Sequence, residues 1–578
     1  MSKRGYVADF ETNTSEEACR VWAYAISDID NPENVIVGNN IDDFMAWCMK
    51  PQNKKVYFHN LKFDAQFILS WLFKHDYKCV KCEDYLTTKT FTTIISDLGM
   101  FYELDIMFNR CKNPNRIKII DSLKLIPLPV SKIAKSFKMP ISKLEIDYNL
   151  TREENHNLTK EEIDYVSNDV KIVAYAIRYF LDSGLTKLTI GSCALSEYKE
   201  IINKKYFKAF YPIPTYDKYI RPSYRGGFTY LSPKFEGKIV KEGIVLDVNS
   251  LYPSVMYNEL LPYGEPIHFE GEYEPHPLYN LYIQSIRCQF ELKPNHIPTI
   301  QIKHGGIFKD NEYLTSSNER EVDLCLTCVD LKLFKDHYNI YNIEYKGGWA
   351  FKGAHNLFKD YIEKWSTNKI NAKKEGNHGL YLISKLFLNS LYGKFATATS
   401  QREKYPYLKD DGTIGYIMSE AKEREGIYLP MATFITAYAR NKTIRSAQKI
   451  TDAYNRGESD IEFIYADTDS LHLKSKGHKI PDNLEIDDFK LGAWKLESKF
   501  IKAKFVRQKC YIELSTEDVA NENPEYKMKV TIAGMPPSLH EKVTFSNFKA
   551  GAIYEGKLLP KNVKGGVILT PVDFTIKK

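Results

Sequence analysis

Hydrophobic and polar positions in the first 189 residues follow two alternating periods. Apolar runs typical of strands occur at Gly5–Phe10, Lys55–His59 and Ile117–Asp121. Stretches with the 3.6-residue period of helices occur at Ile41–Met49 and Lys160–Leu181. Strands that alternate with helices in this way predict an α/β domain with a mixed sheet.

The pattern changes several times over the rest of the chain, which predicts further units. Residues 223–255 indicate strands that lead into a helix, and residues 259–359 indicate an inserted subdomain of short strands and proline-rich turns. After these come a long helical stretch at 358–395, turns at 404–430, a helix at 431–456, a hairpin around Asp467 and a small β-rich C-terminus. A chain of 578 residues is long enough for about four domain-sized units.

The composition is that of a globular protein, with 43% hydrophobic and 27% charged residues. A net charge of only +6 excludes a uniformly basic protein, so a channel for a polyanion would need local clusters of lysine and arginine. Such clusters occur at 499–509 and 557–564. The 40 tyrosines and 31 phenylalanines fit either an aromatic core or platforms for unpaired bases.

The ten cysteines predict reduced thiols rather than a disulfide framework. Two Cys-x-x-Cys pairs occur, Cys79/Cys82 and Cys325/Cys328, but the second lies in an apolar, helix-like run where buried thiols are ordinary. We therefore predict no zinc site. No apolar run reaches about 18 residues and no signal peptide opens the chain, which predicts a protein that neither spans a membrane nor is secreted.

Three carboxylates in the second half of the chain suit metal binding. Asp247 ends an apolar strand, and Asp467 and Asp469 lie two residues apart, which on an extended backbone places both on one side. If the two strands pair, Asp247 and Asp469 face each other and repel unless hard cations lie between them. Mg²⁺ accepts such oxygen ligands, and a pair of ions stabilises the attacking and leaving oxygens of phosphoryl transfer.

Two further segments suit a nucleoside triphosphate. Lys385, Asn389 and Tyr392 share one helical face, where Lys385 supplies a point charge for the phosphates. Tyr252 and Pro253 follow Asp247 at the start of a predicted helix, whose free N–H groups favour phosphate. A flat phenol at Tyr252 would exclude a 2′-hydroxyl. Together these segments predict nucleotide addition to a nucleic acid chain.

A second acidic constellation occupies the N-terminal domain. Asp9 and Glu11 share a strand face, Asp64 follows a later strand, and Tyr165 and Asp169 share a helix face. Four carboxylates with a phenol that orients the attacking water describe a two-metal hydrolytic site.

In this order the motifs resemble those of the family B (α-like) DNA polymerases. Within that family the chain is similar to the protein-primed branch, and looks closest to the polymerases of small Bacillus phages of the phi29 type. The resemblance covers essentially the whole length and includes the linker Tyr224-Arg-Gly-Gly227 and the segment Lys509-Cys-Tyr511.

The resemblance implies an α/β and α+β multidomain fold. A ribonuclease-H-like exonuclease domain is followed by a right-hand polymerase with palm, fingers and a small β-rich thumb, and two subdomains are inserted. The implied units are the exonuclease at 1–189, the palm at 190–258 and 431–530, the first insertion at 259–358, the fingers at 359–395, the second insertion at 396–430 and the thumb at 531–578.

In the N-terminal domain the resemblance implies a 3′–5′ proofreading exonuclease. Its metal ligands would be Asp9, Glu11, Asp64, Asp169 and Glu145, with Tyr165 and Lys143 assisting. The unpaired primer end would be held by Thr12, His59, Asn60, Phe63, Ser122, Leu123 and Tyr148.

In the polymerase half, Asp247, Asp469 and the carbonyl of Val248 would hold metal, with Asp467 close by. The incoming dNTP would be contacted by Tyr252, Lys385, Asn389, Tyr392 and Lys369. Lys369 is the best match for a second phosphate-binding lysine and Lys373 is the alternative, because residues 368–379 depart from the family pattern. Tyr224, Gly226 and Gly227 would balance the primer between the two sites, and Lys509 and Tyr511 would steady its end.

The two insertions imply priming by a terminal protein, with strand displacement and processivity supplied by the chain itself. The implied cofactors are two Mg²⁺ or Mn²⁺ ions for each active site. The implied partners are primer–template DNA, single-stranded DNA, dNTPs and the terminal protein, with no membrane, and the working form would be a monomer or a 1:1 heterodimer. The implied location is the cytoplasm of a bacterial host, for a phage-encoded protein.

Three other interpretations stay open at this point. A repair polymerase would use only nucleic acid primers. A nuclease whose C-terminal half merely binds nucleic acid would leave Asp247, Lys385 and Asp469 without a role. A non-enzymatic scaffold or single-strand-binding protein would bind DNA without any need for Mg²⁺.

Overall fold

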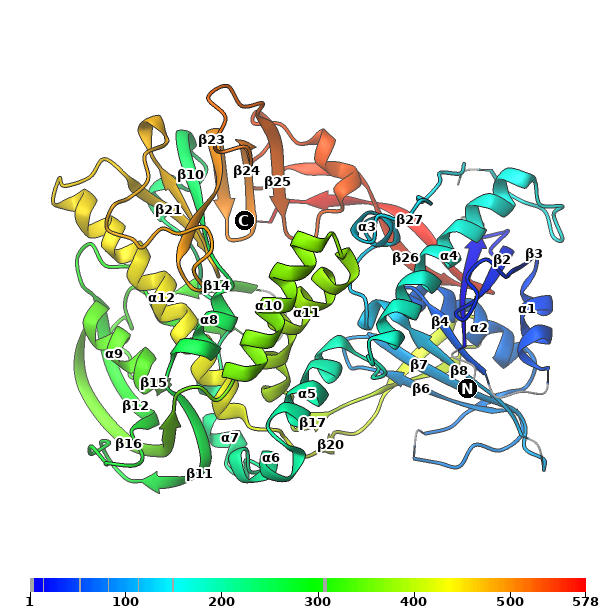
Figure 1. Cartoon of the computed structure of the whole chain (residues 1–578), viewed down its shortest axis with the longest axis horizontal. Coiled ribbons are helices and arrows are strands. Elements are labelled where there is room, and N and C mark those ends of the chain that lie inside the picture. The colour runs from blue at the N-terminus through cyan, green and yellow to red at the C-terminus, as the bar shows by residue number, and fades with distance from the viewer. Residues whose placement is uncertain are drawn as a thin grey trace.

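The computed structural model describes residues 5–13, 15–50, 54–81, 83–112, 114–147, 150–304 and 309–577. Along the longest axis the molecule has two parts (Figure 1): the N-terminal domain, coloured blue to cyan, and a larger body formed by most of the remaining chain. No helix in these described ranges is long and apolar enough to cross a membrane.

The N-terminal domain is built on a mixed sheet of eight strands in the order β3-β2-β1-β4-β8-β7-β6-β5. Strand β1 pairs with β4, and β4 with β8, in parallel, whereas β2 and β7 run antiparallel to their neighbours. The strands are β1 (Tyr6–Thr12), β2 (Val21–Asp28), β3 (Val35–Gly38), β4 (Lys54–Phe58), β5 (Lys78–Cys79), β6 (Thr90–Ile95), β7 (Phe101–Asn109) and β8 (Asn115–Asp121). The predicted α/β domain with a mixed sheet is confirmed.

Four helices accompany this sheet: α1 (Ile41–Cys48), α2 (Leu61–Lys74), α3 (Val130–Ser136) and α4 (Lys160–Asp182). Helix α4 packs across β1 and β2. It begins in a capping box, in which the Thr159 side chain accepts from the Glu162 amide while the Glu162 side chain accepts from the Thr159 amide. These reciprocal bonds satisfy two N–H groups that a helix otherwise leaves unpaired, and so fix where α4 begins.

The larger body contains a seven-stranded antiparallel sheet in the order β25-β24-β23-β10-β22-β21-β9. Its strands are β9 (Thr229–Leu231), β10 (Ile239–Val248), β21 (Glu462–Asp467), β22 (Ser470–Lys474), β23 (Trp494–Arg507), β24 (Cys510–Thr516) and β25 (Lys527–Ile532). Helix α12 (Leu429–Asn455) packs on β21 and on the short helix α8 (Leu251–Asn258). Residues distant in sequence therefore meet in one sheet.

The inserted region at 259–359 forms a four-stranded sheet in the order β11-β16-β12-β15, together with helix α9 (Cys328–His337) and a separate hairpin. The strands of the sheet are β11 (Leu261–Phe269), β12 (Leu281–Leu292), β15 (Val322–Thr327) and β16 (Tyr338–Ala354), and those of the hairpin are β13 (Gln301–His304) and β14 (Lys309–Tyr313). The expectation of short strands was wrong for β12 and β16, which have 12 and 17 residues.

The helix-like interpretation of 322–331 was also wrong in part, because Val322–Thr327 is strand β15 and the helix begins only at Cys328. Leu324 and Leu326 are buried, while Asp323 is exposed and Cys325 half-buried, which is the two-residue period of a strand with one buried face. Cys82, in the other Cys-x-x-Cys pair, lies outside the described residues.

The predicted helical stretch 358–395 is two helices rather than one, α10 (Lys359–Glu375) and α11 (His378–Phe395). Gly376 adopts the left-handed conformation with φ of 69° and ends α10. The Asn377 side chain then accepts from the Leu380 amide and caps α11. Three shorter helices, α5 (Ile190–Ile201), α6 (Lys204–Phe210) and α7 (Asp217–Ile220), lie nearby (Figure 1).

Two hairpin regions return to the N-terminal domain. One comprises β17 (Ser400–Gln401), β18 (Lys404–Leu408), β19 (Ile414–Met418) and β20 (Lys422–Glu423), and the other comprises β26 (Ile553–Val563) and β27 (Gly566–Thr575). Ion pairs join Lys422 to Glu83 at 2.7 Å and Lys561 to Glu16 at 2.8 Å. The side-chain amide of Asn562 donates to the Ile414 carbonyl at 3.1 Å, so the two hairpins also contact each other.

A buried polar pair links two strands of the seven-stranded sheet that are not neighbours. A 2.7 Å hydrogen bond joins Nδ1 of His472 on β22 to Oε1 of Glu513 on β24, and both residues are buried. The rings of Tyr465, Phe505 and Tyr511 surround the imidazole at centroid distances of 5.0–5.6 Å. The bond spans β10 and β23, so it ties together strands that are not neighbours in the sheet.

We expect Glu513→Ala to destabilise this sheet locally by about 3 kcal/mol, because removal of one partner leaves the other polar group buried and unpaired. Hydrogen exchange of the β22 and β24 amides, followed by mass spectrometry, measures the effect. Glu513→Gln keeps an acceptor at the same place and serves as the control. Equal exchange rates in the two variants would contradict the assignment.

Candidate active sites

The first acidic centre lies at one end of the seven-stranded sheet. Asp247 on β10 is the register partner of Ser470 on β22, and the Val248 amide donates to the Asp469 carbonyl at 2.8 Å. The predicted pairing of the two strands is thus confirmed. The extended backbone expected around Asp469 was wrong: Thr468 has a φ of 62°, and the Asp469 amide donates to the Asp467 carbonyl at 2.7 Å in a tight turn.

Burial and mutual repulsion dominate the electrostatics of this centre. Burial, and then the charge of the nearby Asp469, raise the pKa of Asp247 to about 6, against the opposing effect of Lys495 at 3.5 Å. Burial, and then the charge of Asp467, raise the pKa of Asp469. Glu497 on β23 raises the pKa of both aspartates, so it is an acid of the same centre.

Sequence reasoning missed Glu497, because only the pairing of β23 with β10 brings it to the site. A cavity of about 440 Å³ opens onto the centre. It is lined by Asp247, Asp467, Thr468, Asp469, Ser470, His472, Glu497, Lys509, Tyr511 and Lys529.

Lysines gather beside the acids. Burial lowers the pKa of Lys369, and repulsion from Lys385, Lys495 and Lys373 lowers it further, while Asp247 acts in the opposite direction. Helix α10 therefore brings Lys369 close to Lys385 on α11. Their binding of phosphate stays a prediction. Lys495, on the strand next to Asp247, was not anticipated.

Two tyrosines stack beside the acids. The rings of Tyr252 on α8 and Tyr392 on α11 lie 4.2 Å apart at an angle of 19°. Burial raises the pKa of each phenol, so both stay neutral hydroxyls at physiological pH. Lys385 and Asn389 on the same helix α11 are exposed, which leaves them accessible to a ligand.

The linker Tyr224-Arg-Gly-Gly227 is held against α12. The Arg440 guanidinium donates to the carbonyls of Arg225 at 2.7 Å and Gly226 at 2.9 Å, and forms an ion pair with Asp330 at 2.7 Å. A Cβ at Gly227 would come within 2.6 Å of the Thr468 side chain, so only glycine fits against the turn that carries Asp469. Tyr224 packs partly buried against the core.

Lys509 and Tyr511 lie on the far side of the same centre. The Lys509 ammonium pairs with Asp467 at 2.8 Å, and its amide donates to the Tyr465 hydroxyl at 2.9 Å. Tyr511 stacks on Phe505 with a centroid distance of 5.3 Å. The turn between β23 and β24 therefore contacts the turn that carries Asp467 and Asp469 directly.

The second acidic centre is in the N-terminal domain. Asp9 and Glu11 come from β1, Asp64 from α2, and Tyr165 and Asp169 from α4. Burial raises the pKa of Asp9 to about 7, with a further contribution from the charge of Asp169. Burial also raises the pKa of Glu11 and Asp64, and the charge of Asp9 adds to both.

Lys143 and Tyr165 contact this centre. The Lys143 ammonium pairs with Oδ2 of Asp169 at 2.8 Å, and Tyr165 forms a side-chain hydrogen bond with Glu11. The other oxygen of Asp169, Oδ1, is buried and has no hydrogen-bond partner among the described residues. Glu145 is exposed in the irregular segment that also carries Lys143. Its metal role stays a prediction.

The residues expected to hold a primer end flank this centre. His59 forms hydrogen bonds with the Ser122 hydroxyl at 3.0 Å and the Leu128 carbonyl at 2.7 Å. Asp121, which sequence reasoning did not single out, accepts from the amides of Asn60 and Leu123, both at 3.0 Å. This carboxylate joins the segments after β4 and β8. Thr12 ends β1, and Tyr148 lies outside the described residues.

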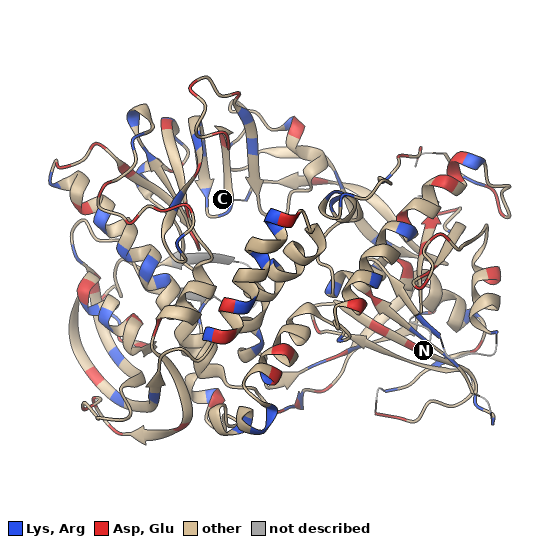
Figure 2. Ribbon diagram, viewed as in Figure 1, with Lys and Arg blue, Asp and Glu red and all other residues tan. Residues whose placement is uncertain are grey.

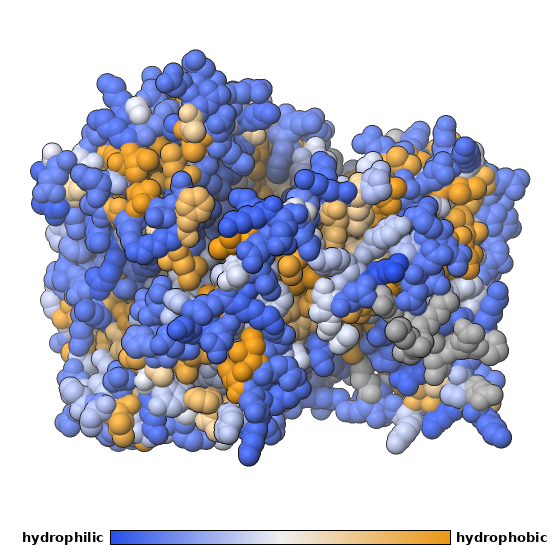
Figure 3. Space-filling view, in the orientation of Figure 1, coloured by the Kyte–Doolittle hydropathy of each residue, from blue (hydrophilic) through white to orange (hydrophobic). Residues whose placement is uncertain are grey.

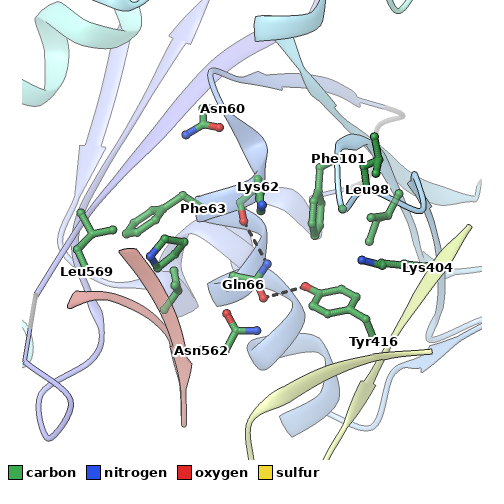
Figure 4. A pocket seen from close by; sticks show the side chains of 14 residues that line it. Asn60, Lys62, Phe63, Gln66, Leu98, Phe101, Lys404, Tyr416, Asn562 and Leu569 are labelled. Carbon is green, nitrogen blue, oxygen red and sulfur yellow. Dashed lines mark hydrogen bonds between the residues drawn. The ribbon is translucent and has the colours of Figure 1, made fainter. Parts of the chain in front are cut away.

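Phe63 points into a cavity of about 450 Å³ where three parts of the chain meet (Figure 4). Lys62, Phe63 and Gln66 come from α2, Lys404 and Tyr416 from the β18–β19 hairpin, and Leu569 from β27. The Tyr416 hydroxyl donates to Gln66 at 2.8 Å across the junction. The cavity combines exposed apolar and ring surface with two lysines, as a site for an unpaired nucleotide does.

The described ranges contain no ready-made group of three or more histidine, cysteine, aspartate or glutamate side chains that could hold a metal ion. Lysine ammonium groups lie against the acids instead, at Asp169, Asp247 and Asp467. Oxygen-only donor sets that are buried and mutually repelling suit a hard divalent cation.

The sequence matches the family described as "DNA polymerase type B, organellar and viral" over residues 46–483. It is 44% identical to the DNA polymerase of Bacillus phage Nf and 44% identical to that of Bacillus phage phi29, in each case over 100% of both chains.

Solved structures of phi29 DNA polymerase align over 100% of both chains at 42–43% identity. The TM-score is 0.93 for the complex with primer–template DNA, and 0.92 for those with single-stranded DNA and with primer–template DNA and incoming nucleotides. The likeness confirms the expected multidomain fold. The chain belongs to the type B DNA polymerases and, within them, to the phi29-type polymerases.

Proposed function

We propose that this DNA-directed DNA polymerase is a protein-primed replicative enzyme. It synthesises processively, displaces the strand ahead and proofreads with its own 3′–5′ exonuclease. One observation carries the combination of synthesis and proofreading: a single chain holds two buried acidic centres on two separate sheets, one flanked by lysines and the other by a phenol. The two chemistries need such separate sites.

Type B polymerases use divalent metal ions, and we propose two Mg²⁺ or Mn²⁺ ions for each centre. The donor sets fit, because buried, repelling carboxylates with raised pKa values and the unpaired Asp169 Oδ1 call for positive charge. In the polymerase centre the ligands would be Asp247, Asp469 and the Val248 carbonyl. In the exonuclease centre they would be Asp9, Glu11, Asp64, Asp169 and Glu145. The ions, when bound, stabilise charge on the attacking and leaving oxygens.

The protein's own residues then orient and neutralise the nucleotide. Lys385 and Lys369 are close enough to repel each other, so a triphosphate between them relieves that repulsion and is held beside the acidic centre. The Tyr252–Tyr392 stack forms a flat wall that fits a deoxyribose and excludes a 2′-hydroxyl. Asn389 lies one turn of α11 after Lys385 and one turn before Tyr392, and completes the nucleotide-facing surface.

We propose that separate sets of residues position the primer end at the two centres. Lys509 and Tyr511 hold the end at the polymerase centre, and Tyr224, Gly226 and Gly227 guide it between the two centres. At the exonuclease centre Thr12, His59, Asn60, Phe63, Ser122, Leu123 and Tyr148 grip it. Tyr165 and Lys143 orient the attacking water there.

We assign residues 1–189 to the exonuclease domain, 190–258 and 431–530 to the palm, 359–395 to the fingers and 531–578 to the thumb. The insertion at 259–358 contacts the terminal protein, and the insertion at 396–430 separates the strands. phi29 DNA polymerase has been solved in complex with primer–template DNA, with single-stranded DNA and with incoming nucleotides. We propose the same three for this chain, acting with a terminal protein in the cytoplasm of a bacterial host.

Protein priming is tested by incubation of the polymerase with a purified candidate terminal protein, labelled dATP, template DNA and Mg²⁺. We expect a labelled covalent protein–dAMP product, which Asp469→Ala abolishes. An enzyme that extends DNA primers fully but never labels the terminal protein of its own genome would show that priming is by nucleic acid alone.

The raised carboxylate pKa values give a pH dependence. A carboxyl whose folded pKa is about 7, against an ordinary 3.8, favours the folded state fully below about pH 4, and this contribution is lost as the pH rises through 7. Asp9→Asn has no carboxyl at this position to ionise, so in EDTA its stability does not fall in this way as the pH rises. Its melting temperature should therefore exceed that of wild type by an increasing margin between pH 5 and pH 8.

Scanning calorimetry measures this margin, and Asp488→Asn at an exposed position is the control. Mg²⁺ at pH 8 should raise the melting temperature of wild type more than that of Asp9→Asn, because the variant lacks one charged ligand. A margin that stays constant with pH, or equal shifts with Mg²⁺, would contradict the assignment of Asp9.

A further inference from the structure

The start of helix α11 lies against the N-terminal domain. There it contacts α3 and α4, whereas its other end packs on α5, where Gly191 faces Lys394. Figure 1 shows the α10–α11 hairpin reaching toward α3, and Figure 3 shows side chains filling the space between the hairpin and the N-terminal domain on this face. The position of α11 is therefore set at its two ends by two different parts of the chain.

One hydrogen bond joins the N-terminal domain to the cap of α11. The Tyr179 hydroxyl on α4 donates to Oδ1 of Asn377 at 3.0 Å. The same oxygen accepts from the Leu380 amide at 3.0 Å and so caps α11. A phenol from one domain thus binds the atom at which a helix of the other part begins. Tyr179 is half-buried, which partly shields this bond from water.

Packing beside this bond leaves room only for glycine at position 379. A Cβ at Gly379 would come within 2.7 Å of the Tyr179 ring and 3.0 Å of the Phe137 ring. These two rings meet edge to face with their centroids 5.7 Å apart, and Gly379 is buried against them. The backbone of α11 therefore lies directly on the rings, and the contact holds the start of α11 at a defined distance from α4.

The contact contains no charged side chain. Residues 376–384 are Gly-Asn-His-Gly-Leu-Tyr-Leu-Ile-Ser, and in Figure 2 the charged residues of the hairpin tip lie at the end of α10 rather than at the start of α11. Its strength comes from close packing and a neutral hydrogen bond, which salt does not screen, whereas contacts to phosphate weaken as salt rises. Its effect can thus be told apart from an effect on DNA binding.

The side chains assigned to the nucleotide follow on the same helix. Lys385 lies about two turns of α11 after His378, and Asn389 and Tyr392 come next on that face. A displacement at the start of a helix moves the side chains along it. A site whose groups are no longer held in place binds its ligand more weakly, because those groups must be ordered when the ligand binds.

We propose that Tyr179, a residue of the N-terminal domain, is a positioning residue for nucleotide addition at the polymerase centre. It acts by fixing the start of α11, and it does not line the cavity that opens onto the polymerase acids. This rests on the proposed nucleotide-binding role of α11. Helix α4 also carries Tyr165 and Asp169 of the other acidic centre, so one helix serves both centres.

The first test measures the KM for a dNTP in single-nucleotide addition. The primer ends in a phosphorothioate linkage, which resists shortening. Tyr179→Phe keeps the ring and loses the hydrogen bond, so the KM should rise about fivefold while kcat stays within about twofold of wild type. Tyr179→Ala also loses the packing, and the KM should rise about tenfold or more. Both rises should be the same at low and high salt.

Tyr175→Phe is the matched control. Tyr175 lies one turn earlier on α4, and its hydroxyl donates to Glu33 at 2.9 Å within the N-terminal domain. This variant should leave the KM unchanged. Shortening of single-stranded DNA without dNTPs should stay within about twofold of wild type in all three variants, because α4 is held by its own cap and by β1 and β2.

The second test is a double-mutant cycle on the hydrogen bond itself. Asn377→Ala removes the acceptor, so it should raise the KM on its own. Adding Tyr179→Phe to Asn377→Ala should then change the KM by less than about twofold, because the bond is already absent. A full fivefold rise in that background would show that the Tyr179 hydroxyl acts elsewhere, and would overturn the inference.

An unchanged KM in both Tyr179 variants would also overturn it. So would equal losses of extension and shortening, which would mean that Tyr179 only supports the fold of α4. Lys385→Ala tests the proposed function separately. If it leaves the KM unchanged, the nucleotide-binding role of α11 fails, and the inference with it. If it raises the KM while Tyr179→Ala does not, only the positioning role of Tyr179 fails.

Discussion

Repulsion between buried carboxylates is the constraint on which this molecule's two centres depend. At each centre the backbone places acids close together, away from water, where each disfavours the charge of the next. Lys143, Lys495 and Lys509 offset part of that cost in the structure. A divalent cation between the carboxylates would reduce the same repulsion more strongly than a lysine does. The pairing of the strands, which brings the carboxylates together, therefore favours binding of such a cation.

The polymerase centre is held together by contacts among several separate segments rather than by a single motif. The Arg440 side chain ties the linker 224–227 to α12 and α9, Gly227 packs on the turn that carries Asp469, and the Tyr465 hydroxyl ties that turn to Lys509. The linker 224–227, the turn that carries Asp469 and the segment at Lys509 thus share a few contacts. A displacement of any one of them changes the others, which suits a site that must hold several groups in line.

Sequence reasoning found the fold class and most of the side chains that meet at the two centres, because those residues follow strands or repeat on helix faces. It failed where long-range packing decides. Glu497 and Lys495 reach the site only through the pairing of β23 with β10, and Asp121 acts through two amides from separate segments. The break at Gly376 and the strand at 322–327 were missed because helical and strand patterns overlap in short apolar runs.

Separation of the two activities by single substitutions is the most direct measurement. A 5′-labelled primer on a longer template is incubated with Mg²⁺, with and without dNTPs. Asp469→Ala should lose extension by about a thousandfold and keep shortening, because several kcal/mol of charge stabilisation vanish at one centre only. Asp9→Ala should keep extension and lose shortening. The activity that each variant keeps shows that this variant is folded. Loss of both activities in either variant would contradict two separate centres.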